Sequence, residues 1–292
     1  MSSVLYDAPG PRTRRRILWS SLVAAVVVLA LLALVVARLA DGGQFARAKW
    51  SPLVDPGDPV FSQVWRLIGQ GLKSTLVAAA LAMVLSLLIG TALAVVRLLL
   101  RRMARLPVVG LIELLRGVPV VITIFFAYRV LPELGLDLAS LWYLVIGLTG
   151  YNAVIIAEIV RAGVASLPRG QTEAAYAIGL TRWQTMREVL LPQAVRVMLP
   201  ALISQLVVVL KDTSLVAVLG GYTELLRQGQ LIIQNLGNPI QVFFVVALLF
   251  VVINYALSRL AVYVERRLSR GRRRTAGVPP AADAQSDAVT GA

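Results

Sequence analysis

The sequence contains no cysteine and no histidine. Without cysteine the chain has no disulfide bond and no thiol nucleophile, and without histidine it lacks imidazole acid–base catalysis and the usual zinc sites. Charged residues are also few, at 15% of 292 residues, whereas apolar residues make up 58%. A water-soluble domain of this length cannot bury such an excess of apolar side chains. The composition therefore indicates a protein of the lipid bilayer.

Six apolar stretches account for this excess. A helix that crosses a bilayer needs about 20 mainly apolar residues, and the stretches cover residues 17–37, 72–96, 117–131, 141–160, 197–220 and 242–264. We therefore expect an all-α membrane protein with six transmembrane helices. The third stretch is short and contains Arg129. In this region we expect a lead-in helix at the membrane surface over Pro107–Arg116 and a break at Gly117 and Pro119.

The formal net charge of +14 predicts how these helices are oriented, since cytoplasmic loops of membrane proteins carry an excess of lysine and arginine. If both termini are cytoplasmic, the segments richest in arginine all lie on the cytoplasmic side. These segments are residues 12–16, 97–105, 161–196 and 259–274. The charge pattern thus predicts six spans with both termini inside.

A polar segment, "GQTEAAYAIGLTRWQTMREVLLPQA", separates the fourth and fifth apolar stretches. We expect a short helix over Gln171–Ile178, with Gly179 ending it. Thr181 is placed to cap a second helix, and Gln184 three residues later completes a capping box. Pro192 then ends or kinks this second helix. The pattern predicts a helix, a tight turn and a second helix.

By itself this pattern fits more than one function. An ordinary helical loop between two spans is one interpretation, and a helix-turn-helix that reads DNA is another. The DNA interpretation is unfavourable, because spans on both sides hold the segment close to anionic headgroups that repel DNA. We therefore expect no nucleic-acid partner.

The spacing of this segment resembles the EAA loop found in membrane subunits of ABC importers. Glu173, Ala174 and Ala175 are followed by Gly179 and later by Leu191-Pro192, in the order typical of that loop. The stretches "ELLRGVPVVITIFF", "AEIVRAGVASLPRGQTEAA", "LPQAVRVMLPALISQLVVVLKDTSL" and "ELLRQGQ" are similar to the polar amino-acid permeases of the same superfamily, of the glutamate/glutamine type. The family usually has asparagine where Ser204 stands here, which leaves the substrate open.

The resemblance implies a type I ABC importer core of five helices, preceded here by an extra helix. The chain would then divide into a basic cytoplasmic N-terminus (1–16), a transmembrane anchor (17–37), an extracytoplasmic connector (38–61), the permease core (62–268) with its cytoplasmic coupling loop (162–196), and a cytoplasmic tail (269–292). Proline and glycine predict an irregular connector, and the tail is predicted to be disordered. The first apolar stretch also resembles a signal peptide, but it is longer than the roughly 7–15 apolar residues of a signal core.

The resemblance also implies partners in a bacterial cytoplasmic membrane. The coupling loop would insert into a separate ATPase subunit, through the residues Arg169, Gly170, Glu173, Ala174, Ala175, Gly179, Leu191 and Pro192. ATP and magnesium would bind to that ATPase, so this chain would hold no cofactor and would not itself be an enzyme. The further expected partners are a second permease subunit, identical or related, an extracytoplasmic amino-acid-binding protein, the lipid bilayer and the amino-acid substrate.

Polar residues in the apolar helices mark a candidate substrate pathway, because ionisable groups in a membrane are costly. Gln205 and Asp212 are seven residues apart and so differ by about 20° around a helix. The candidate pathway residues are Asn152, Ser204, Gln205, Lys211, Asp212 and Ser214. Asp212 would hold the ammonium group of an amino acid, or else would pair with Lys211 or an adjoining subunit.

Other charged residues leave two interpretations open. Glu158 and Arg161, three residues apart at the end of the fourth stretch, form either a structural ion pair or part of a gate. Arg129 would favour an anionic substrate side chain, and the absence of a further acid beside Asp212 disfavours cationic amino acids. We expect an importer for glutamate, glutamine or aspartate. A self-sufficient secondary transporter or channel is the alternative, although such proteins often contain internal repeats, and none is evident here.

Overall fold

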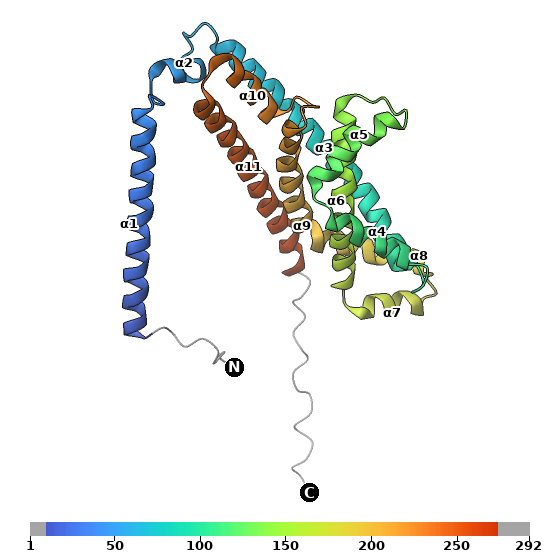
Figure 1. The fold of residues 1–292 in the computed structure, drawn as a ribbon. Helices are drawn as coiled ribbons and strands as arrows, with labels where there is room; N and C mark the ends of the chain where they lie inside the picture. The colour runs from blue at the N-terminus through green and yellow to red at the C-terminus, as the bar shows by residue number, and fades with distance from the viewer. Residues whose placement is uncertain (1–9, 274–292) are drawn as a thin grey trace.

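The computed structural model describes residues 10–273, and the side chains of residues 10–263. Within this part of the chain every regular element is a helix. Five helices are long and apolar enough to cross a bilayer, and a bent pair of helices raises the number to six if it is taken as one span. The predicted all-α class agrees with this architecture (Figure 1), and the predicted number of six spans is reached when the bent pair counts as one span.

The extra N-terminal helix, α1 (Pro11–Asp41), stands apart from the bundle, and none of its residues is buried. It leads into α2 (Arg47–Val54), a short helix in the segment that the sequence predicted to be an irregular connector. That prediction was wrong for these residues, because α2 buries Pro52 and Leu53 against the core and becomes ordered by packing. The Trp65 indole also donates a hydrogen bond to the carbonyl of Leu53 over 3.0 Å.

Two long helices form the centre of the bundle. α3 (Phe61–Leu99) and α6 (Ser140–Ala165) pack along much of their lengths. Gly90 of α3 lies so close to Ala153 and Ile156 of α6 that a Cβ atom would not fit. Small residues allow helix backbones to approach in this way, which increases the dispersion contacts that hold membrane helices together. α6 is accordingly the most buried of the candidate spans.

The predicted break in the third apolar stretch is confirmed. α4 (Leu106–Gly117) and α5 (Val120–Glu133) meet at an angle of 100°. Val118 is extended, with φ −89° and ψ 129°, because the ring of a following proline disfavours helical geometry at the preceding residue. With 14 residues, α5 is about 21 Å long, so it does not cross a bilayer of about 30 Å by itself.

The second half of the chain contains α7 (Arg169–Ala177), α8 (Arg182–Gln184), the π-helix η1 (Thr185–Leu190), α9 (Leu191–Asp212), the 3₁₀-helix η2 (Thr213–Val218), α10 (Leu225–Leu236) and α11 (Pro239–Arg273). α10 was not predicted. The predicted disordered tail begins at residue 269, but α11 continues to Arg273, and the rest of the tail lies outside the described residues.

The molecule has two distinct ends. The start of α1, α7 and the last described turn of α11 lie at one end, and α2 and α10 lie at the opposite end (Figure 1). We call these the α7 end and the α10 end. α10 rests on α3, where Leu225 N donates a hydrogen bond to Thr75 Oγ1 over 3.0 Å.

Candidate functional site

The turn that follows α7 has the predicted geometry. Leu180 N donates to the carbonyl of Ala175 over 3.1 Å, and Gly179 N donates to the carbonyl of Tyr176 over 3.0 Å. These two bonds form a Schellman motif, which requires a left-handed residue after the helix. Gly179 supplies it with φ +84°, a conformation that glycine adopts without a steric penalty. The glycine breaker is confirmed, and α7 begins at Arg169, two residues earlier than expected.

The second helix of the unit begins with the predicted capping box. The backbone N–H of Gln184 donates to Thr181 Oγ1, and the backbone N–H of Thr181 donates to Gln184 Oε1 over 2.9 Å. The chain then stays helical from Arg182 to Val218, so Pro192 does not end the helix, and a change of helix type lies just before it. The π-helix η1 directly precedes α9, and a proline in the first turn of a helix lacks only an N–H that would have no helical partner.

The residues expected to couple to an ATPase lie around this turn, and most of them are exposed. Arg169, Gly170, Glu173, Ala174, Gly179 and Pro192 are exposed, and Leu191 is half-buried. Ala175 is 4% exposed and packs within the chain, so only Ala174 of the adjacent alanines offers its side chain to a partner. The Gln193 amide donates to Gln171 Oε1 over 2.9 Å, which ties α7 to the first turn of α9.

Three large apolar side chains at the same turn were not singled out from the sequence. Tyr176, Ile178 and Trp183 are exposed by 47%, 78% and 53%. Their position in the sequence could have indicated this exposure. Apolar residues that flank a capped turn in a polar segment have no core of their own to enter. Exposed apolar groups clustered on a rigid turn are suited to the centre of a protein interface.

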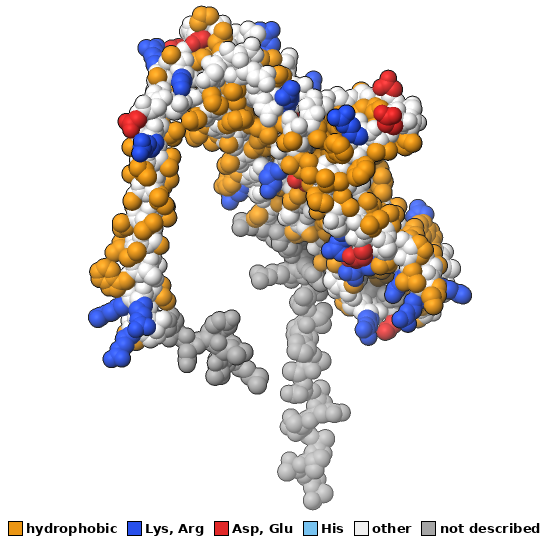
Figure 2. Space-filling view, in the orientation of Figure 1, with side chains coloured by type: hydrophobic (Ala, Val, Ile, Leu, Met, Phe, Trp, Pro, Cys, Tyr) orange, Lys and Arg blue, Asp and Glu red, His pale blue; other side chains and the backbone are white. Residues whose placement is uncertain are grey.

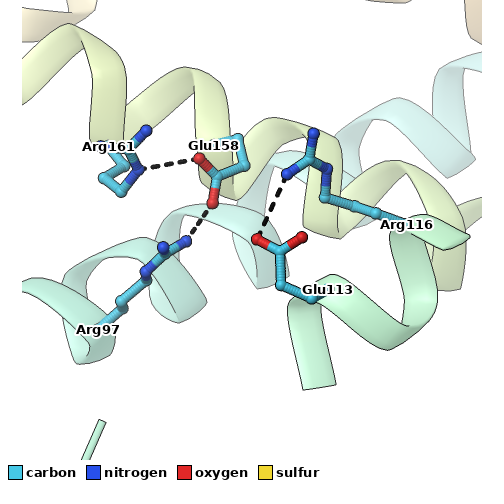
Figure 3. Close-up of polar contacts among 5 residues, drawn as sticks. All are labelled: Arg97, Glu113, Arg116, Glu158 and Arg161. Carbon is cyan, nitrogen blue, oxygen red and sulfur yellow. Dashed lines mark hydrogen bonds and ion pairs between the residues drawn. The ribbon is translucent and has the colours of Figure 1, made fainter. Parts of the chain in front are cut away.

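Glu158 lies between two arginines at the α7 end of the bundle (Figure 3). Arg161 Nε is 2.8 Å from Glu158 Oε2, and Arg97 of α3 contacts Glu158 Oε1. The ion pair that the sequence left open is therefore present, and it has a second cation that sequence reasoning missed. Arg97 lies far from Glu158 in the chain, so only the packing of α3 against α6 reveals it. Beside this cluster, Arg116 lies 3.5 Å from Glu113 on α4.

Two of the candidate pathway residues meet inside the bundle. The Gln205 amide of α9 donates to Asn152 Oδ1 of α6 over 2.7 Å, and Asn152 is fully buried. Its own amide donates to the carbonyl of Leu148 over 2.8 Å. The buried hydroxyl groups of Ser86 on α3 and Thr149 on α6 have no hydrogen-bond partner among the described residues. Buried polar groups thus occur on α3 and α6, and one of them on α6 bonds to α9, which packs against both.

The other candidate pathway residues do not form one cluster. Ser204 Oγ donates to the carbonyl of Pro200 over 2.9 Å, and Ser214 Oγ donates to the carbonyl of Lys211 over 2.7 Å, so both bonds are local. Lys211 is exposed and Asp212 is half-buried. No ion pair joins Lys211 to Asp212 among residues 10–263, so the structure does not contain the pair that the sequence offered as an alternative role for Asp212.

Glu224 fixes the start of α10. Its two carboxylate oxygens accept hydrogen bonds from the N–H groups of Leu226 and Arg227, each over 2.8 Å. Burial raises the pKa of the Glu224 carboxyl above its ordinary value, against the opposing effect of these two bonds. Among residues 10–263, no cluster of acidic side chains has the arrangement of a metal site.

Comparison with known proteins extends this picture. The model of the family of binding-protein-dependent transport system inner membrane components matches residues 86–270. The glutamate transport system permease protein GluD of Corynebacterium glutamicum is 42% identical over 243 residues, which cover 81% of this chain and 85% of that protein. The glutamine transport system permease protein GlnP of Escherichia coli is 36% identical over 213 residues, which cover 71% and 97%.

The fold has a counterpart among solved structures. In the crystal structure of an amino acid ABC transporter with histidines, one chain matches with a TM-score of 0.65 and 29% sequence identity. The match covers 71% of this chain and 96% of that one.

Proposed function

Because this chain belongs to the family of binding-protein-dependent transport system inner membrane components, we propose that it is the permease subunit of an ATP-driven importer for polar amino acids. Glutamate, glutamine and aspartate are the favoured substrates, since similar permeases transport glutamate or glutamine. The observation that carries the proposal is the capped turn after α7, which presents Glu173, Ala174 and exposed apolar side chains at one end of the bundle.

The α7 end faces the cytoplasm in this proposal. Arginines of the α3–α4 turn and of the segment around α7 gather there, and the cytoplasmic loops of membrane proteins carry such an excess. The charged groups around α7 and α8 in Figure 2 include several arginines. With the six spans counted above, both termini lie inside a bacterial cytoplasmic membrane, and α2 and α10 lie on the extracytoplasmic side.

The turn couples this chain to a separate ATPase that binds ATP and magnesium. α7 enters a groove of that subunit, with Glu173 as a polar contact and Tyr176, Ile178 and Trp183 as apolar ones. When the ATPase closes, α7 moves as a rigid body, because the Schellman turn and the capping box fix it to the next helix. The bond between Gln171 and Gln193 passes this movement to α9.

Movement of α9 opens the substrate pathway. α9 carries Gln205, which in this structure is bonded to Asn152 of α6. Separation of α9 from α6 frees both amides to bind the carboxylate and ammonium groups of an amino acid, while Asp212 attracts the ammonium group. A second permease subunit and an extracytoplasmic binding protein complete the importer. A self-sufficient transporter would leave the exposed turn after α7 without a role.

Co-purification tests this proposal. The detergent-solubilised protein is isolated from its own host as wild type and as Glu173→Lys, and bound proteins are identified by mass spectrometry. We expect a P-loop ATPase with the wild type and its loss in the variant. Glu188→Lys is the matched control, because Glu188 is an exposed glutamate on η1. Absence of an ATPase from the wild type in several mild detergents would refute the importer assignment.

A further inference from the structure

Lys73, Arg129 and Lys211 are basic side chains of apolar helices without an acidic partner among residues 10–263. Lys73 lies in α3, Arg129 in α5 and Lys211 in α9, and all three are exposed. None of them takes part in an ion pair among residues 10–263. Cationic groups within apolar helices are costly to keep, so they mark a pathway or a ligand site by default.

The same short connection links the surroundings of all three. The chain from η2 to α10 passes beside α3, where Tyr222 Oη donates to the carbonyl of Ser74 over 3.3 Å, next to Lys73. Gly221 packs against the ring of Tyr128, next to Arg129, so closely that a Cβ would not fit. Lys211 stands just before η2. The helices that carry the three cations therefore meet around this connection, and the Arg129 guanidinium lies 5.9 Å from the centroid of the Phe125 ring on its own helix.

Acidic groups in this region do not cancel the positive charge. Asp212 adjoins Lys211, but Glu224 is turned into the first turn of α10 and accepts two backbone N–H groups there. Glu133 and Asp137 are exposed at the turn between α5 and α6, and neither forms an ion pair with Arg129. Figure 2 shows basic side chains over the upper parts of α3 and α5 on the face that it presents.

We infer that Lys73, Arg129 and Lys211 form a cationic entrance at the α10 end that favours amino acids with a carboxylate side chain over the corresponding amides. This inference rests on the proposed function, in which that end receives the substrate. Glutamate and glutamine have nearly the same size, so they differ mainly in one negative charge. In a partly hydrated site, loss of three positive charges within roughly 10 Å of that charge changes the preference about tenfold or more.

A simpler role would place these side chains at the membrane surface, where lysine and arginine extend their charged ends into water. In such a role, loss of the charges changes membrane insertion and stability, and it changes the transport rates of glutamate and glutamine by the same factor. The ratio of the two transport rates therefore separates the two roles.

The test uses the whole importer, with its ATPase and binding protein, in proteoliposomes. ATP-dependent uptake of L-glutamate and L-glutamine is measured for wild type and for the triple variant Lys73→Gln/Arg129→Gln/Lys211→Gln. The same binding protein serves both complexes, so its own preference cancels when their ratios are compared. The matched control is Arg101→Gln/Arg102→Gln/Arg105→Gln, which removes three exposed charges at the α7 end.

We expect the glutamate-to-glutamine ratio to fall about tenfold in the triple variant and to stay within about twofold of wild type in the control. An unchanged ratio with measurable uptake would overturn the cationic entrance and leave the importer assignment intact. If the wild type transports neither amino acid with ATP, the proposed function itself fails. If the triple variant does not assemble, the three single variants are measured instead. The product of their three changes in the glutamate-to-glutamine ratio should then reach about tenfold, and a product close to one would overturn the cationic entrance.

Discussion

Gln205 of α9 donates a hydrogen bond to the fully buried Asn152 of α6 over 2.7 Å. This bond joins α9, which continues the helical segment after the turn that follows α7, to the most buried span of the bundle. It is the direct side-chain link between α9 and α6 that movement of α9, as proposed above, would break.

The pair predicts a measurable coupling energy. In a double-mutant cycle with Asn152→Ala and Gln205→Ala, we expect an interaction free energy of about 1 kcal/mol, within the range of polar pairs between membrane helices. Unfolding of the solubilised protein provides the free energies. Ser204→Ala serves as the control, because Ser204 bonds only to its own helix, so its effect should add to that of Asn152→Ala.

Gly179 and Gly170, which lie after and within α7, predict opposite effects of a change to alanine. Gly179→Ala forces an alanine into φ +84°, which costs about 1–2 kcal/mol, and we expect faster hydrogen exchange in α7 and weaker ATPase binding. Gly170→Ala lies within helical α7 with open space around a Cβ, so it should slow exchange in α7 by favouring the helix. Equal effects of the two changes would contradict the assigned turn.

The cluster around Glu158 predicts a strong effect of removing one carboxylate. Glu158→Gln leaves Arg97 and Arg161 without their anion, and the Glu158 side chain is 19% exposed. We expect a loss of about 2 kcal/mol in the free energy of unfolding, less than the 3–5 kcal/mol of a fully buried pair. The control is Glu113→Gln, whose partner lies 3.5 Å away on an exposed surface and which should cost about 0.5 kcal/mol or less. Similar losses for both variants would show that the cluster does not hold α3 to α6.

Glu224 predicts a pH dependence for the docking of α10. Because burial raises the pKa of this carboxyl in the folded state, the folded protein binds the proton more tightly than the unfolded chain. Its contribution to stability is thus fully present below the ordinary pKa of 4.5 and is lost as the pH rises through the higher pKa of the folded state. Hydrogen exchange of α10, compared at matched intrinsic rates, should show protection that falls over this range. In Glu224→Gln the dependence should disappear, and a variant that keeps it would assign the effect to another group.

Local sequence patterns predicted several parts of the site correctly. The break between α4 and α5 follows from Val118-Pro119, and the turn after α7 follows from Gly179 with its capping box. Each depends on the geometry of a few adjacent residues, so no knowledge of packing is needed. Pro192 shows the limit of this approach, because the helix continues through it after a π-helical segment, although a proline can end a helix.

The sequence by itself determined that this protein is a bundle of apolar helices with a polar helical turn between two of them. Apolar run length is set against bilayer thickness, and turn residues act on their own backbone. Tertiary structure alone decided that Arg97 joins Glu158, that Gln205 joins Asn152, that Ala175 is buried and that α10 rests on α3. These contacts join residues far apart in the chain or depend on which side of a helix faces its neighbour, and only the packing of the helices sets that rotation.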